Sequence, residues 1–372
     1  MRAATALGVA AGVAGTGSLV LAGWLKTAFA EASRVRRSVA LVGAGEIVRA
    51  AHLPSYIQLG LEIRGIWDLN PERGEELARS VGVPALDSLE ALLDDVDTLV
   101  VDVAVPPEEQ PAILYQVFAA GKHALAQKPL APTLDEATNL VDAAREAGVL
   151  LAVNQQMRWE PAIVTCYRLL TAGRLGRVKG ATFTLKRPMI GASLPSWVAS
   201  APRLTVLLNS IHFIDSCRFL FGEPLALSCH TWKHEGFGVV GETGAELKIT
   251  FADDISVSIV DELVSPRDPL VATFQLLASN AIVDASLGLW VDYPKGAPDQ
   301  IEVTWASGRV EDLGAGERWL PDAFKGPISE LFAAIEERRS PTIDGADHLR
   351  TLRIVEAAYI SASRAIPVEL RA

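Results

Sequence analysis

Cysteine and basic charge are both scarce in this chain of 372 residues. Its three cysteines are too few and too scattered for a disulfide framework or a zinc site, so they indicate small core residues in a reducing compartment. The formal net charge is −11, and the only basic tract is "RVRR" at 34–37. This balance argues against a nucleic-acid partner, because phosphate binding needs concentrated lysine and arginine. His230 and His234 have no carboxylate cluster beside them, so no metal site is expected.

Charge is absent from Ala3 to Leu25, a run long enough in principle to span a bilayer. The run is rich in alanine and glycine and therefore weakly hydrophobic, and "AFA" at 28–30 resembles a signal-peptidase site. Basic residues follow the run, so the positive-inside rule would keep the globular part in the cytoplasm. We treat residues 1–37 as an extension outside the fold. The extension is either a membrane anchor or export signal, or a dispensable segment. We expect a cytoplasmic protein, and the alternative is a protein anchored in the membrane or exported through residues 1–30.

Short apolar strands alternate with helical segments from residue 38 to residue 157. The expected strands are "SVALVG", "LEIRGIWD", "DTLVVDVAVPP", "KHALAQKP" and "VLLAVN". Helix-start signals lie between them: Asn70 precedes a proline, and Thr133 stands three residues before Glu136 in a capping box. This alternation predicts βαβ units, and therefore a doubly wound parallel sheet of the Rossmann type over residues 38–157.

The pattern changes in residues 158–372. Seven alternating strands joined by short polar turns follow one another, from "VKGATFTLKR" to "QIEVTWA". Helices are expected at "EPAIVTCYRLLTAG", at "IHFIDSCRFLFG" and in two amphipathic segments near the C-terminus. The sequence therefore predicts an α/β protein whose second domain contains a large antiparallel or mixed sheet with one face buried.

The stretch "VGAGEIV" joins the first strand to the first helix, which is the place of a dinucleotide-binding loop. Gly43 permits the tight turn, and Gly45 lets backbone N–H groups approach a pyrophosphate at the helix N-terminus. Val48 stands where the motif has a third glycine, so we expect the helix to shift slightly outward and the phosphate site to remain usable. The alternative is that the two glycines merely form a turn.

Asp68 ends the second strand, 25 residues after the first glycine of the turn. We expect its carboxylate to accept hydrogen bonds from the adenosine ribose and to repel a 2′-phosphate, which favours NAD over NADP. Arg73 lies close in sequence and leaves NADP possible.

Lys128 ends the strand "KHALAQKP", at the carboxyl edge that faces the ligand crevice. An ammonium there can polarise the oxygen of an alcohol or ketone. His212 can take a hydroxyl proton near neutral pH, and Asp215, three residues on, either fixes its tautomer or pairs with Arg218. The alternatives are an ordinary surface lysine and a buried packing histidine.

These segments, in this order, resemble the Gfo/Idh/MocA oxidoreductase family. The resemblance runs from about residue 38 to the C-terminus and is carried by "VALVGAGEI…AAHLP", "AAGKHALAQKPLAPTLDEA", "IHFIDSCRFLFGEP" and "GPISELFAAIEERRSPTIDGADHLRTLRIVEAA". It implies a Rossmann domain and a C-terminal α/β domain for substrate and oligomerisation, built on a large open, mostly antiparallel sheet that often forms a dimer interface. The expected partners are a sugar or polyol substrate and further copies of the chain, as a dimer or tetramer.

The resemblance also implies roles for single residues. Lys128 matches the lysine of the family's Glu-Lys-Pro motif, and His212 matches its catalytic histidine. The implied reaction is hydride transfer between NAD(P) and a carbinol of a sugar, cyclitol or polyol, with His212 as general base and Lys128 polarising the substrate oxygen. Gln127 replaces the motif's glutamate, and Leu208 replaces an aspartate that many members carry. The adjacent Asn209 cannot act as a base.

Further site residues are expected along the same crevice. The cofactor is expected to contact Gly43, Gly45, Glu46, Ile47, Asp68, Val105, Pro106 and Lys128. The substrate is expected to contact Arg158, Trp159, Arg187, Trp197, Asn209 and Asp215, since arginine binds hydroxyls and tryptophan stacks on sugar faces. Two other functions stay open. One is a catalytically weak NAD-binding sensor or partner protein, which the changes at 127 and 208 favour. The other is an NAD-assisted lyase or glycosidase.

Overall fold

The computed structural model describes residues 36–188, 194–291, 293–314 and 316–370. The expected anchor, signal or dispensable segment therefore lies outside the described residues, except for its last two positions. Within the described ranges, no helix has both the length and the apolar character needed to cross a bilayer.

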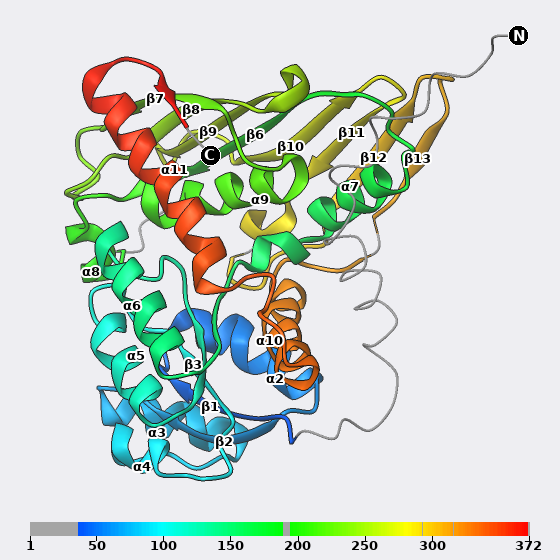
Figure 1. Cartoon of the computed structure of the whole chain (residues 1–372). Helices are drawn as coiled ribbons and strands as arrows, with labels where there is room; N and C mark the ends of the chain where they lie inside the picture. The colour runs from blue at the N-terminus through cyan, green and yellow to red at the C-terminus, as the bar shows by residue number, and fades with distance from the viewer. Residues whose placement is uncertain (1–35, 189–193, 292, 315, 371–372) are drawn as a thin grey trace, which may run out of the picture.

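Two sheets make up the molecule, one above the other in Figure 1. The lower sheet is parallel, with strand order β2-β1-β3-β4-β5. Its strands are β1 (Ser38–Val42), β2 (Glu62–Trp67), β3 (Val100–Val103), β4 (His123–Ala126) and β5 (Leu151–Val153). The strand order reverses between β1 and β3, and ligands bind outside the carboxyl ends of strands at such a reversal. The predicted Rossmann sheet is confirmed.

Helices on both faces cover this sheet. They are α2 (Leu53–Gln58), α3 (Pro71–Val81), α4 (Leu89–Leu93), α5 (Gln110–Ala119) and α6 (Leu134–Glu146). The two start signals read from the sequence act as caps: Asn70 accepts a hydrogen bond from the Arg73 N–H, and Thr133 accepts one from the Glu136 N–H. The expected strand "DTLVVDVAVPP" forms only the four residues of β3, after which the chain passes beside the glycine turn.

The upper sheet has nine strands in the order β13-β12-β11-β10-β6-β9-β8-β7-β14. Only β6 and β9 pair in parallel within the described sheet, so the predicted mostly antiparallel sheet is confirmed. The strands are β6 (Val178–Pro188), β7 (Ala226–Trp232), β8 (Gly244–Thr250), β9 (Ser256–Val264), β10 (Val271–Ala278), β11 (Ala281–Ser286), β12 (Gln300–Trp305), β13 (Val310–Asp312) and β14 (Val368–Glu369). The short edge strands β13 and β14 were not expected.

Helices cover the lower face of the upper sheet, and the C-terminal helices connect the two sheets (Figure 1). The helices on this side are α7 (Pro161–Thr171), α9 (Ile211–Phe221) and α11 (Gly345–Arg364). Another, α10 (Lys325–Glu337), packs Ile328 and Phe332 into the same apolar cluster as Val39 of β1. Late segments of the chain therefore complete the core of the first sheet, and the division at residues 157 and 158 stays a prediction.

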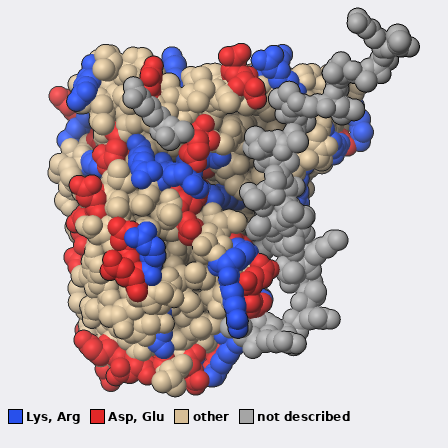
Figure 2. All heavy atoms as spheres, in the orientation of Figure 1, with Lys and Arg blue, Asp and Glu red and all other residues tan. Residues whose placement is uncertain are grey.

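The described surface mixes both signs of charge. Figure 2 shows basic and acidic side chains interspersed over one face, with a run of basic side chains across its middle. The three cysteines are buried and free. Among the described residues, no group of three or more histidine, cysteine, aspartate or glutamate side chains is placed to hold a metal ion.

Candidate active site

The loop after β1 depends on Gly43. Its φ is +105°, and a Cβ there would lie 2.3 Å from the carbonyl oxygen of Ala104, so no larger residue fits. A Cβ on Gly45 would meet no protein atom within 4 Å. The second glycine therefore borders open space at the start of a helix, which suits the close approach of a phosphate to the backbone.

The valine at the third glycine position is accommodated by a wider helical turn. A π-helical turn, η1 (Val48–His52), begins at Val48, whose side chain is fully buried. The Arg49 N–H still donates to the Gly45 carbonyl at 3.1 Å, so the first turn after the loop remains closed. Glu46 is exposed and Ile47 is half-buried on this turn.

Asp68 is buried at the end of β2, and both its oxygens are engaged. Oδ2 accepts from the Ala44 N–H at 2.7 Å, and Oδ1 accepts from the Asn70 N–H at 2.8 Å. Arg73 donates to both oxygens, at 3.1 and 2.7 Å. The carboxylate therefore holds the glycine loop in place, and its contact with a ribose stays a prediction. Because Arg73 neutralises part of its charge, discrimination against a 2′-phosphate depends also on the surroundings.

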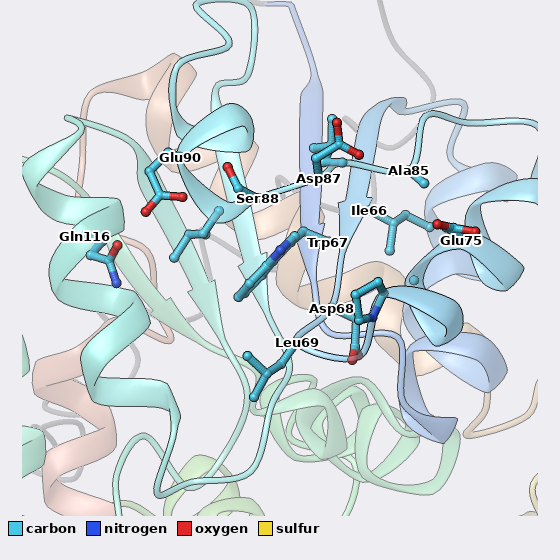
Figure 3. Close-up of a pocket in the computed structure, with 14 residues that line it drawn as sticks. Ile66, Trp67, Asp68, Leu69, Glu75, Ala85, Asp87, Ser88, Glu90 and Gln116 are labelled. Atoms are coloured by element: carbon cyan, nitrogen blue, oxygen red, sulfur yellow. The ribbon is translucent and has the colours of Figure 1, made fainter.

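Those surroundings form a cavity of about 560 Å³. Figure 3 shows Trp67 in its centre, Glu90 and Gln116 on one side, and Asp68 and Glu75 on the other. The volume is that of a small-molecule site, and its acidic lining disfavours an additional phosphate. Sequence reasoning did not find this pocket, because its lining comes from β2, α3, α4 and α5.

The loops after β1 and β3 lie against each other. A Cβ on Gly43 would lie 3.4 Å from Cγ1 of Val105, and Val105 and Pro106 are both half-buried. The expected cofactor residues from these two loops are thus brought together at the reversal of strand order.

Gln127 connects β4 to a buried histidine. Nδ1 of His52 lies 2.7 Å from an oxygen of Asp102, so Nδ1 carries the proton and Nε2 is left as an acceptor. The Gln127 amide donates to that Nε2 at 3.1 Å, while its Oε1 accepts from the Lys128 N–H at 2.8 Å. A carboxylate at 127 could not donate to this imidazole, which gives a physical reason for glutamine beside the lysine.

The ammonium of Lys128 donates to a backbone carbonyl. Nζ lies 2.5 Å from the carbonyl oxygen of Leu208, in the π-helical turn η3 (Val206–Ser210) before α9. At position 208, where the resemblance led us to note a leucine in place of an aspartate, the backbone therefore accepts from the lysine. Burial and the positive charge of Arg187 lower the pKa of Lys128 to about 7, while Asp261 acts in the opposite direction.

His212 lies in the first turn of α9, buried and edge-on to Trp319 with 5.9 Å between ring centroids. Burial lowers the pKa of His212 well below its ordinary value, and the positive charges of Lys128 and Arg187 act in the same direction. Among the described residues its ring nitrogens have no hydrogen-bond partner. The imidazole is therefore neutral at physiological pH and free to accept a proton.

Asp261, on β9, is a member of the cluster that sequence reasoning missed. It is fully buried, and Oδ2 accepts from Asn209 Nδ2 at 2.8 Å and Ser210 Oγ at 2.7 Å. Burial raises the pKa of this carboxyl group. The other inward-facing residues of β9 are apolar. An acidic residue at an inward position of an alternating strand was the signal that could have identified it.

Arg187, near the end of β6, completes the cluster. Its guanidinium lies 4.7 Å from the ring centroid of Trp290, and Nη2 lies 3.8 Å from Oδ1 of Asp261. The structure thus brings Lys128, Arg187, Asn209 and His212 together among the residues expected from the sequence.

Arg158 and Asp215 belong instead to a buried ion-pair network. The Arg158 guanidinium donates to both oxygens of Asp215, each at 2.7 Å, and also to Asp347 on α11. Arg218 lies 3.6 Å from the same Asp215 carboxylate. Of the two alternatives for Asp215, pairing with Arg218 is the one the structure contains, together with a stronger pair to Arg158.

Two tryptophans expected at the substrate have other surroundings in the structure. A Cβ on Gly326 would lie 2.2 Å from the indole of Trp159, so Trp159 packs tightly against α10. Trp197 is on the short helix α8 (Ser196–Ser200), with 37% of its surface exposed. For Arg158, Trp159, Trp197 and Asp215, substrate binding stays a prediction.

Known proteins resemble the chain in both sequence and fold. Residues 37–155 match the sequence model of a family described as "Oxidoreductase family, NAD-binding Rossmann fold". D-apiose dehydrogenase from Paraburkholderia graminis is 28% identical over 339 residues, 89% of each chain. Levoglucosan dehydrogenase from Pseudarthrobacter phenanthrenivorans is 28% identical over 220 residues, 52% of this chain and 54% of the relative. A structure of levoglucosan dehydrogenase in complex with NADH and L-sorbose has a TM-score of 0.77 at 21% identity, covering 91% of this chain and 99% of the other.

Proposed function

We propose that the chain is an oxidoreductase of the Gfo/Idh/MocA type and that it transfers a hydride between NAD and a carbinol of a sugar, cyclitol or related polyol. The observation that carries the proposal is the approach of a low-pKa lysine and a neutral histidine, Lys128 and His212, beside the sheet edge that bears the glycine loop. The likeness to D-apiose and levoglucosan dehydrogenases supports a sugar substrate.

The residues around the glycine loop fit a dinucleotide. Gly43 and Gly45 would hold the pyrophosphate, and Asp68 and the acidic cavity beside it would hold the adenosine without a 2′-phosphate. Glu46, Ile47, Val105 and Pro106 would border the site. When bound, the nicotinamide supplies a hydride acceptor.

The side chains of the cluster would manage the proton of the substrate hydroxyl. His212 accepts it, because its imidazole is neutral and its nitrogens are unengaged within the described structure. Lys128 donates a hydrogen bond to the same oxygen and stabilises its developing negative charge. To do so, its ammonium exchanges its bond to the Leu208 carbonyl for one to the substrate. Asp261 positions the turn that carries this carbonyl, through Asn209 and Ser210.

We further propose a cytoplasmic homo-oligomer, a dimer or tetramer. Three buried free thiols suit a reducing compartment. No described element covers the outer face of the nine-stranded sheet, where Leu277 and Ile282 on paired strands are 37% and 38% exposed. Such a face suits association with another copy.

Replacing the lysine tests the proposal. Lys128→Met should lower NADH formation from an oxidisable sugar or polyol at least about a hundredfold, because the substrate oxygen loses its charged donor. NAD affinity by calorimetry should stay within about threefold. Lys179→Met, at an exposed position of β6, is the matched control and should leave both unchanged. Undiminished turnover in Lys128→Met would remove the lysine from the reaction.

The same assay separates the two other functions. Tight NAD binding without turnover of any sugar, inositol or derived acid would indicate a sensor or partner protein. Product formation without net NADH would indicate an NAD-assisted lyase or glycosidase. Glutamine at 127 and leucine at 208 favoured the sensor function in the sequence. In the structure, the Gln127 side chain and the Leu208 carbonyl both accept hydrogen bonds from Lys128 and hold it in place, which weakens that argument.

A further inference from the structure

The guanidinium of Arg187 is held firmly but incompletely paired. It stacks on Trp290, and 21% of its side chain is exposed, so a small molecule can reach it. Its Nε is buried and has no hydrogen-bond partner among the described residues. Its ion-pair partner there, Asp261, lies at 3.8 Å, which is too long for a hydrogen bond. A guanidinium offers five N–H donors, so this one keeps capacity for a ligand.

The cluster around Arg187 also carries an excess of positive charge. Of the described carboxylates, only Asp261 shifts the pKa of either Lys128 or Arg187. One of its oxygens already accepts bonds from η3, and His212 is neutral. Arg187 and the ammonium form of Lys128 thus share the single carboxylate of Asp261, and a neutral sugar would leave the excess positive charge uncompensated.

We propose that the substrate is a sugar acid, an aldonate or uronate, whose carboxylate pairs with Arg187 while one of its carbinols lies at Lys128 and His212. The planar fork of a guanidinium matches the two oxygens of a carboxylate better than it matches hydroxyl groups. The inference rests on the proposed function, of which it specifies the substrate class.

A substrate carboxylate paired with Arg187 would also change the pKa of Lys128. Arg187 lowers the pKa of Lys128, so a substrate carboxylate on Arg187 offsets that effect and favours the ammonium form. An acidic substrate would therefore help to maintain the charged donor that acts on its own carbinol, whereas a neutral substrate would not.

Matched acid and neutral substrates test the proposal. The full chain is supplied with NAD and with D-gluconate or D-glucitol, and with D-galacturonate or D-galactose, and NADH formation is followed. We expect kcat/KM to favour the acid of a pair at least about tenfold, from one charge-assisted pair. If the neutral member reacts as well or better, the acid proposal is overturned while the proposed function stands.

Variants of the arginine test its part in that preference. Arg187→Gln should lower the ratio of acid to neutral kcat/KM at least about tenfold, mainly through KM, and Arg187→Lys should retain part of it, since it keeps the charge but not the fork. Arg174→Gln is the matched control: Arg174 also stacks on a tryptophan, Trp305, at 4.6 Å, and the ratio should not change. An equal loss for both substrates in Arg187→Gln would contradict the proposal.

Calorimetry decides the case in which no pair is oxidised. Gluconate and galacturonate are titrated into the protein with NAD present. If an acid binds to the wild-type protein but not to Arg187→Gln, the acid site is supported. In that case only the proposed hydride transfer is refuted. Absence of uptake for both acids overturns the acid proposal.

Discussion

At the scale of single residues, backbone groups and side chains together hold the lysine of the candidate site. Lys128 is held by a backbone carbonyl of Leu208, and Gln127 supplies a donor that a glutamate would lack. Asp261, on the strand β9 far away in sequence, supplies the carboxylate whose negative charge raises the pKa of Lys128. At 208 the backbone carbonyl therefore matters more than the side chain, whereas at 127 the amide side chain itself makes the contacts.

The opposing effects of Arg187 and Asp261 on Lys128 predict a pH dependence. Because the ammonium form acts on the substrate and its pKa is about 7, kcat/KM with a neutral polyol should fall as pH rises above 7, by up to about tenfold per unit. His212 stays neutral over this range. Arg187→Gln should move the fall to higher pH, and Asp261→Asn should move it to lower pH.

Stopped-flow or steady-state NADH formation between pH 5.5 and about 9.5 measures these profiles. Shifts in the same direction for both variants would refute the electrostatic account. A wild-type rate that rises through pH 7 would make the neutral amine of Lys128 the base instead of His212.

At the scale of elements, short irregular turns and regular elements both contribute to the candidate site: His212 lies on α9, Arg187 on β6 and Asp261 on β9. The π-helical turn η1 follows the glycine loop, and the π-helical turn η3 accepts a hydrogen bond from Lys128 through the Leu208 carbonyl. η3 is fixed at its start by Glu242, which accepts from the Leu204 and Val206 N–H groups, and at its end by Asp261.

The two glycines of the loop should respond differently to the same added methyl group. Gly43→Ala places a Cβ 2.3 Å from a carbonyl oxygen at a φ of +105°, and should lower the free energy of unfolding by about 2 kcal/mol or more. Gly45→Ala has open space, so stability should change by less than about 0.5 kcal/mol, whereas NAD affinity should fall about tenfold.

Urea denaturation and calorimetry with NAD separate the two effects. Unchanged NAD affinity in Gly45→Ala would show that the pyrophosphate does not approach the loop there. A stable Gly43→Ala would show that the loop can move away from β3.

At the scale of the whole molecule, buried ion pairs join segments that are far apart in sequence. Arg158 follows the parallel sheet, Asp215 is on α9 and Asp347 is on α11, and all three are buried. Removing one partner of such a network leaves an uncompensated buried charge.

Arg158→Met should therefore lower the free energy of unfolding by about 3–5 kcal/mol in urea titrations. Arg168→Met, at an exposed position on α7, serves as the control and should change it by less than about 0.5 kcal/mol. A stable Arg158→Met with weakened substrate binding would instead support the sequence-based expectation that Arg158 contacts substrate.

Local patterns were enough to predict both sheets, the caps at Asn70 and Thr133, and the glycine loop. Each depends on neighbours within a few residues, through hydrogen bonds along the backbone or the alternation of apolar side chains. The same locality explains the predicted positions of Lys128 at a strand end and His212 on a helix.

The partners of those side chains were decided only by the tertiary structure. Asp261 and Arg187 come together because β6 and β9 pair in parallel. Arg158 and Asp215 meet because the short helical turn η2 (Gln156–Trp159) packs against α9. The sequence by itself determined which groups could donate, accept or titrate. Folding determined which of them share a buried, weakly screened space, since charge interactions depend on separation and burial that sequence distance does not report.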